Sequence, residues 1–129
     1  MPQKELPPVE LLRKLLTYDP ETGIFVWNPR GPSDFIGSAG HGAAWKAANW
    51  NAQRAGKRAF SLRADGYLAA HFLGAMYRAH RIAWAMHYGE EPSGKIDHIN
   101  GDRTDNRIVN LRVVSDTGNA RNMARSSAK

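Results

Sequence analysis

The sequence contains no cysteine, which excludes disulfide frameworks and zinc sites with cysteine ligands. It has no apolar run long enough to cross a membrane, and the opening stretch "MPQKELPPVE" lacks the apolar core of a secretory signal. We therefore expect a soluble, cytoplasmic protein with no membrane partner. At 129 residues, the chain can bury a core without cross-links and form one domain, or one domain with an appended segment.

Acidic residues are in the minority: 12 Asp and Glu residues stand against 18 Lys and Arg residues, a formal net charge of +6. The excess is concentrated in residues 45–81, where Asp65 is the only acidic residue. A cationic chain favours phosphate-rich partners, because each neutralised phosphate releases condensed counterions. Charge alone does not separate a nucleic-acid-binding face from a solvated face that aids solubility.

The first part of the chain predicts a short amphipathic helix. Leu11, Leu12, Leu15 and Leu16 recur at helical spacing after two prolines, which indicates a helix from about Val9 to Tyr18. The four leucines share one face of that helix, so we expect this face to be buried.

Strands and an irregular loop are predicted next. The stretch "IFVW" at residues 24–27 favours a strand, and Asp65-Gly66 is typical of a turn between two further strands. Residues 28–56 are rich in Gly, Ala and Asn and are expected to form an irregular loop. Trp45 and Trp50 within it are expected to anchor the loop to the core, with stacking on a ligand as the alternative.

The last third predicts a helix, a hairpin and a second helix. The stretch "HRIAWAMHYG" has helical spacing and ends at Gly89, a suitable C-terminal cap. "KIDHI" predicts a strand, and "NLRVV" at residues 110–114 is its natural hairpin partner. Ser115 is a candidate N-cap for a final helix through "DTGNARNMARSS". This order brings the end of the first strand beside the final helix.

Polar side chains from the strand and the helix are expected to form a site. Asp97 and His98 end the strand, while Asn119, Asn122 and Arg125 are three residues apart and share one side of the helix. A carboxylate and an amide are hard ligands that suit magnesium or manganese better than a structural zinc. A histidine beside them is suited to take a proton from an attacking water. A metal–histidine site in a cationic chain indicates nucleic acid as the partner.

The stretch "IDHINGDRTDNRIVNLRVVSDTGNARN" resembles the catalytic segment of the HNH endonucleases, the ββα-metal nucleases, and in particular their cysteine-free branch common in phages and intron-homing enzymes. "YRAHRIAWAMHYG" and "LLTYDPETGIFVW" resemble other segments of such phage proteins. The resemblance implies an α+β fold, with a ββα-metal core in residues 76–129. Residues 1–75 would supply an N-terminal helix and a small antiparallel β-sheet, a candidate DNA-contacting region, and the two parts are expected to form one compact unit.

The resemblance also implies a role for each site residue. Asp97 and Asn119 would bind a single divalent cation, with Mg²⁺ preferred and Mn²⁺ as the alternative. His98 would be the general base, and the amide of Asn110 would pin the loop between the strands so that His98 is correctly oriented. Asn119 stands where the family usually has a histidine. Asn122 is the competing candidate for the metal, with a phosphate contact as its other role.

Further DNA contacts are expected from Arg81, Arg121, Asn122 and Arg125, as phosphate contacts that position a duplex without reading its sequence. The alternative for the helix arginines is that they are solvated charges. For His80, we expect capping or core packing rather than a DNA contact. The other polar residues of the motif are assigned to building the loop: Asn100, Gly101, Asp102, Asp105 and Asn106.

The expected function is a metal-dependent DNA endonuclease that hydrolyses phosphodiester bonds in double-stranded DNA. A DNA-binding module that kept the scaffold without cutting, and an RNA-directed nuclease, are the alternatives. If the chain is phage-encoded, its expected location is the host-cell cytoplasm. The sequence leaves open the target specificity, nicking against double-strand cleavage, a monomeric or homodimeric state, and a role in homing, packaging or defence.

Overall fold

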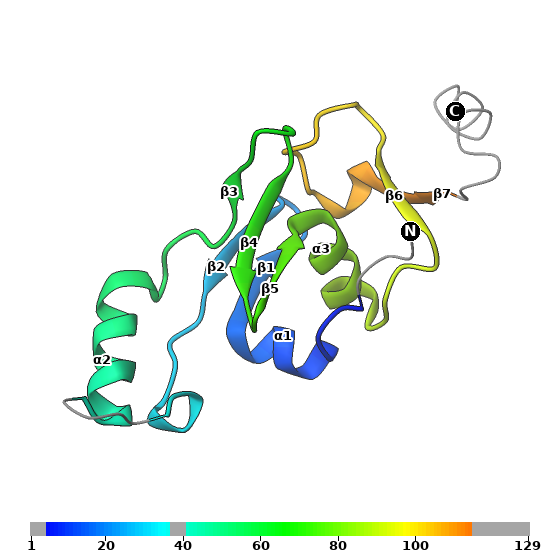
Figure 1. The fold of residues 1–129 in the computed structure, drawn as a ribbon. Coiled ribbons are helices and arrows are strands. Elements are labelled where there is room, and N and C mark those ends of the chain that lie inside the picture. The colour runs from blue at the N-terminus through cyan, green and yellow to red at the C-terminus, as the bar shows by residue number, and fades with distance from the viewer. Residues whose placement is uncertain (1–4, 37–40, 115–129) are drawn as a thin grey trace.

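The structure is a computed structural model that describes residues 5–36 and 41–114. Helices and strands mix along the chain, so the α+β fold class expected from the sequence is confirmed (Figure 1). The elements in chain order are α1 (Val9–Leu15), β1 (Leu16–Asp19), β2 (Ile24–Trp27), the 3₁₀ helix η1 (Pro32–Asp34), α2 (Ala43–Arg54), β3 (Ser61–Leu62), β4 (Leu68–Phe72), β5 (Ala75–Arg78), α3 (Ala79–Tyr88), β6 (Lys95–His98), the 3₁₀ helix η2 (Ile108–Asn110) and β7 (Leu111–Val114). The expected final helix lies outside the described residues.

The described strands form three small antiparallel sheets around α3. β1 pairs with β2, β4 lies between β3 and β5, and β6 pairs with β7. Helix α3 contacts α1, β4, β5 and η2, so it lies where these units meet. Within residues 5–36 and 41–114, every helix is too short or too polar to span a lipid bilayer.

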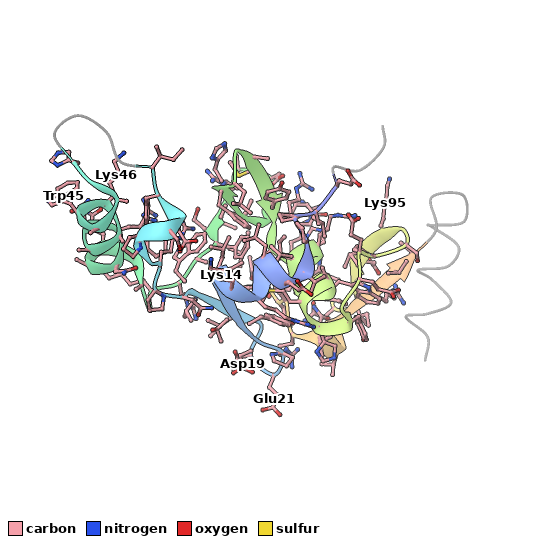
Figure 2. All side chains as sticks on the ribbon, turned by 90° about the horizontal axis from the view of Figure 1, so that it is seen from below. Lys14, Asp19, Glu21, Trp45, Lys46 and Lys95 are labelled. Atoms are coloured by element: carbon pink, nitrogen blue, oxygen red, sulfur yellow. The ribbon has the colours of Figure 1, made fainter. Side chains whose placement is uncertain are left out.

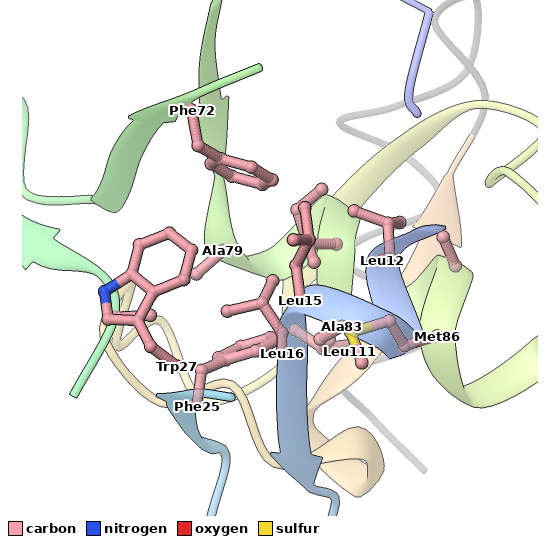
Figure 3. Close-up of a cluster of buried hydrophobic side chains, with 13 residues drawn as sticks. Leu12, Leu15, Leu16, Phe25, Trp27, Phe72, Ala79, Ala83, Met86 and Leu111 are labelled. Carbon is pink, nitrogen blue, oxygen red and sulfur yellow. The ribbon is translucent and has the colours of Figure 1, made fainter. Parts of the chain in front are cut away.

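One hydrophobic cluster joins the beginning and the end of the described chain (Figure 3). Leu12 from α1 and Ile82 from α3 are fully buried, and Leu111 at the start of β7 joins the same cluster. The cluster therefore draws on both parts expected from the sequence, residues 1–75 and 76–129. The boundary between those parts stays a prediction.

The first helix is shorter than its leucine spacing predicts. It ends at Leu15, and Leu16 is already extended and begins β1, with Leu16 opposite Trp27 in the β1–β2 ladder. The expected helix end at Tyr18 is therefore wrong. The turn at residues 20–23 brings a β-branched and aromatic stretch against β2, and this pairing overrides the local helical pattern.

The expectation of an irregular loop through residues 28–56 is also wrong, because residues 43–54 form helix α2. Alanine has the highest helix propensity, and several alanines follow the N-cap Gly42. The asparagines and glycines of the stretch obscured this local preference in the sequence.

The two tryptophans of α2 have different surroundings. Trp50 contacts Trp27 edge to face, with ring centroids 5.8 Å apart, so it anchors α2 to the core as expected. Trp45 is 50% exposed and stacks on His41 at 3.7 Å, so the anchoring prediction is wrong for this residue. Figure 2 shows Trp45 and Lys46 together at one end of the molecule.

Several expected elements are confirmed. The strand at residues 24–27 is β2, and Asp65-Gly66 lies in the turn between β3 and β4, where Gly66 has a φ of 88°. Helix α3 ends at Gly89, whose left-handed backbone lets its N–H donate to the carbonyl of Ala85. The predicted hairpin partners are β6 and β7.

Candidate active site

The β6–β7 hairpin places Asp97 and His98 side by side at the end of β6. In the antiparallel ladder, Asp97 is opposite Arg112 and His98 is opposite Leu111. Because successive residues of a strand point to opposite faces, the carboxylate and the imidazole leave the strand on different sides. The hairpin continues one step further, where the Ile99 N–H donates to the carbonyl of Asn110 at 2.8 Å.

Asp97 forms an ion pair that leaves one carboxylate oxygen unused. Its Oδ2 accepts a hydrogen bond from Arg112 Nε at 2.8 Å and forms an ion pair with Arg112 Nη2 at 2.6 Å. Its Oδ1 has no hydrogen-bond partner in the described part of the chain, and it is not among the buried polar atoms that lack one. Arg112 thus orients the carboxylate, and Oδ1 is the atom available to a cation.

The imidazole of His98 is packed against other rings but is not sealed in the core. The residue is 6% exposed, its ring centroid lies 5.1 Å from that of His80, and Tyr67 lies 6.0 Å away. Nε2 of His98 lies 2.9 Å from Oδ1 of Asn106. Nδ1 forms no hydrogen bond within residues 5–36 and 41–114, and it is not one of the buried atoms that lack a partner.

His80 is a core residue, as the sequence analysis favoured over a DNA contact. It is 6% exposed and packs against His98 and Tyr67. Burial, and then the positive charge of a protonated His98, lower the pKa of His80 to about 3. His80 is therefore neutral at physiological pH and does not add charge beside His98.

Arg81 is buried at 9% exposure, and its Nη1 donates to the carbonyl of Gly94 at 3.2 Å. Burial lowers the pKa of this guanidinium. The contact links α3 to the residue before β6, so Arg81 has a structural role. Its proposed DNA contact stays a prediction. The other expected DNA contacts, Arg121, Asn122 and Arg125, lie outside the described residues.

The loop at residues 99–110 is pinned by the side chain of Asn110. Oδ1 of Asn110 accepts the Asn100 N–H at 3.0 Å, and Nδ2 donates to Asn100 Oδ1 at 3.0 Å and to the Asp105 carbonyl at 2.8 Å. Asn110 is 4% exposed. Its amide bonds backbone groups of the loop that have no partner strand. It does not contact His98 directly.

Asp105 and its neighbours complete the loop. Asp105 accepts hydrogen bonds from Arg107 Nε at 2.8 Å and from Asn100 Nδ2 at 2.9 Å. The hydrogen bond from Arg107 is the main cause that lowers the pKa of Asp105 to about 2. Asp102 accepts from the backbone N–H and hydroxyl of Thr104. These side chains shape the turn, as the sequence analysis assigned them.

A hollow of about 430 Å³ lies beside the two catalytic candidates. Its walls are formed by Tyr67, Lys95, Ile96, Asp97, His98, Gly101, Arg103 and Val114. The guanidinium of Arg103 lies 4.9 Å from the ring centroid of Tyr67 and donates to the Asp65 carbonyl at 2.7 Å. Residues Asp97 and His98 and the cationic residues Lys95 and Arg103 therefore line one open hollow, a composition that suits a phosphodiester.

Sequence reasoning missed Tyr67 and Arg103 as residues of this site. Tyr67 comes from the strand region before β4, and Arg103 comes from the loop after β6. Tyr67 lies in the basic stretch of residues 45–81, which does not point to a particular side chain, and Arg103 lies outside that stretch. Their proximity depends on how the β3–β4 turn meets the 99–110 loop.

The donor set fits a hard cation that keeps water ligands. Among the described residues, no three His, Asp or Glu side chains converge as a metal-binding group. Asp97 Oδ1 is one hard oxygen with no hydrogen-bond partner among residues 5–36 and 41–114, and cysteine ligands are absent from the sequence. Magnesium is commonly bound by one or two protein carboxylates plus water and phosphate. Asn119, the expected second ligand, lies outside the described residues.

Part of the chain is similar to a known protein family. A family model described as HNH endonuclease matches residues 77–121. No curated protein and no solved structure matches the chain. The matched segment contains α3, the β6–β7 hairpin and the loop between them, but neither the β1–β2 hairpin nor Tyr67.

Proposed function

We propose, from the match of residues 77–121 to a family model described as HNH endonuclease, that the protein is a metal-dependent endonuclease that hydrolyses phosphodiester bonds in double-stranded DNA. The observation that carries the proposal is the shared hollow lined by Asp97, His98 and Arg103. Residues with a carboxylate, an imidazole and a guanidinium thus line one space, which supports the proposed roles of cation ligand, proton acceptor and phosphate contact.

His98 is the proposed general base. Its Nδ1 has a lone pair when Nε2 carries the ring hydrogen, and this atom is free of hydrogen bonds within the described residues. Water attacks phosphorus as Nδ1 takes its proton, the bond from phosphorus to the leaving sugar oxygen breaks, and solvent protonates that oxygen. A base placed in this way contributes on the order of 10²–10⁴-fold to the rate.

Asp97 and Asn119 are the proposed ligands of a single divalent cation, Mg²⁺ first and Mn²⁺ second, with Asn122 as the competing ligand. Such a cation, when bound, polarises the phosphate and stabilises charge on the leaving oxygen. Arg112 holds Oδ2 of Asp97, which orients the carboxylate and leaves Oδ1 for the cation. Asn110 keeps the loop in place without touching the reacting atoms.

Phosphate contacts are proposed at the edge of the hollow. Arg103 and Lys95 border it, and the net charge of +6 attracts the polyanion over longer distances. Arg121, Asn122 and Arg125 stay candidate contacts from the sequence. Cytoplasmic location and a phage or intron-homing origin stay predictions.

A DNA-binding module that does not cut is the second candidate. The ion pair between Asp97 and Arg112 favours it, because it satisfies one carboxylate oxygen without any cation. Plasmid cleavage in the presence of a divalent cation distinguishes the two functions.

Supercoiled plasmid incubated with the protein in Mg²⁺ or Mn²⁺ should be nicked or linearised, and EDTA should abolish this activity. Asp97→Asn should lose cleavage because it removes the charge that binds the cation, whereas Glu10→Gln, at an exposed position of α1, should cut as the parent does. Retained plasmid binding without cleavage in either metal would favour the binding module. Digestion of structured RNA but not of DNA would overturn the choice of substrate.

A further inference from the structure

Asn106 is a polar residue with an unusual position in the loop between β6 and β7. It is 1% exposed and is among the largest fully buried side chains of the described residues. The loop itself is held by Asn100, Asp105 and Asn110, whose side chains bond to one another and to the backbone. The side chain of Asn106 takes no part in that network, and its single hydrogen bond is to His98.

The contact fixes which nitrogen of His98 carries the hydrogen. Asn106 Oδ1 can only accept, so Nε2 of His98, 2.9 Å away, is the donor. A neutral imidazole has one N–H, and Nδ1 therefore keeps the lone pair that a general base needs. Asn106 thus selects the form of His98 that can accept a proton from water.

Packing alone does not account for an asparagine at this position. Nδ2 of Asn106 is buried and has no hydrogen-bond partner within the described chain. An unsatisfied buried donor costs about 1–3 kcal/mol. Leucine has the same branching at Cγ and would avoid this cost, but it would offer no acceptor to His98.

The β1–β2 hairpin holds the backbone of Asn106 from the other side. The Tyr18 hydroxyl donates to the Asn106 carbonyl, and burial raises the pKa of Tyr18, so the hydroxyl stays a donor. The Ile108 N–H donates to the Pro20 carbonyl at 3.0 Å. The closest approach is at Gly23, where a Cβ would lie 2.6 Å from the carbonyl carbon of Asn106.

We infer that Asn106 is a positioning residue for His98, and that the β1–β2 hairpin clamps it in place. The hairpin lies outside residues 77–121, so the matched family segment would not orient its own base without it. The catalytic meaning of this arrangement rests on the proposed nuclease function, whereas the arrangement itself is tested without activity.

The test is ¹⁵N NMR of the His98 imidazole at a pH where the ring is neutral, with His98→Gln used to assign its signals. The parent should carry its hydrogen on Nε2. Asn106→Asp keeps an acceptor and should preserve this form, whereas Asn106→Leu should shift the population toward Nδ1–H. In the plasmid assay, Asn106→Leu should cut about 10–100-fold more slowly, the usual loss for partners that orient active-site groups, and Asn106→Asp should recover part of the rate.

Two glycines provide the matched control for the clamp. Gly23 and Gly56 both have positive φ, at 76° and 80°, but a Cβ at Gly56 meets nothing within 4 Å. Gly23→Ala and Gly56→Ala therefore carry similar backbone strain, and only the first displaces Asn106. Gly23→Ala should alter the His98 signals and slow cleavage, while Gly56→Ala should do neither. Tyr18→Phe should act in the same direction, and Tyr88→Phe, at an exposed site, should not.

The outcomes separate the two proposals. A parent with Nδ1–H, or His98 signals unchanged in Asn106→Leu, overturns the positioning role even if plasmid is cut. A parent that cuts no nucleic acid but shows the expected shift overturns the nuclease proposal and upholds the contact. If Asn106→Leu does not fold, Gly23→Ala and Tyr18→Phe answer the same question, because unchanged His98 signals in both would overturn the positioning role.

Discussion

The β1–β2 and β6–β7 hairpins have ladders of the same size but different connections. β1 and β2 are joined by the turn at residues 20–23, whereas β6 and β7 are joined by residues 99–110. The first hairpin buries Phe25 and Trp27 in the core. The second carries the carboxylate and imidazole of the candidate site, and its stability depends on polar contacts within the long loop.

The difference shows how a polar loop is kept in one conformation. A short turn lets the backbone ladder run to its end, but a long connection leaves backbone groups that need other partners. The side chain of Asn110 is a partner for two of these backbone groups. The β1–β2 turn provides another partner, because the Ile108 N–H donates to the Pro20 carbonyl. The apolar hairpin is thus the rigid support for the polar one.

Removing the apolar support should have the largest effect on folding. Phe25 is 4% exposed, stacks on Tyr18 at 4.6 Å and meets Phe60 edge-on at 4.7 Å. Phe25→Ala should lower the free energy of unfolding by about 3–5 kcal/mol, measured by urea titration. Val26→Ala, at the next and less buried position of β2, should cost less than half as much. Equal losses would show that β2 does not supply the core support described here.

Removing the Asn110 side chain should lower the free energy of unfolding by less than Phe25→Ala does. Asn110→Ala loses three side-chain hydrogen bonds and leaves buried groups unpaired, so we expect the free energy of unfolding to fall by about 2–3 kcal/mol. Asn49→Ala, on the exposed face of α2, should change it by less than about 0.5 kcal/mol. If both variants unfold at the same urea concentration, another group holds the loop.

The buried His80 behind the site should make stability depend on pH. Because its pKa is lowered to about 3 in the folded chain, only the unfolded chain takes up a proton there between about pH 6.5 and 3. Stability should therefore fall as the pH drops through this window, by at most about 1.4 kcal/mol per pH unit from this group. His80→Phe should flatten the slope in urea titrations at several pH values. An unchanged slope would contradict a buried, neutral His80.

The sequence predicted the parts of the fold that local patterns determine. The helical spacing and the cap at Gly89 gave α3, and the motif placed Asp97, His98 and Asn110 on and beside the β6–β7 hairpin. The hydrogen bonds of Asn110 hold the loop, and the role in orienting His98 that the resemblance implies for it stays a prediction. These features depend on residues that are close in sequence.

The features that were missed depend on contacts between distant segments. Leu16 is extended rather than helical because it pairs with Trp27 of β2. The residues near Leu16 in sequence do not indicate this pairing. Asn106 was assigned to the loop because its link to His98 and its clamp by Tyr18 exist only in the folded chain. The same reason hid the approach of Tyr67 to His98.

The most direct test of the account is the cleavage of supercoiled plasmid in Mg²⁺ by His98→Ala, beside His87→Ala as a control at an exposed histidine. We predict that His98→Ala cuts on the order of 10²–10⁴-fold more slowly than the parent, while it binds plasmid equally well in EDTA. His87→Ala should match the parent in both assays. Cleavage by His98→Ala at the parent rate would contradict the assignment of the base and the site built around it.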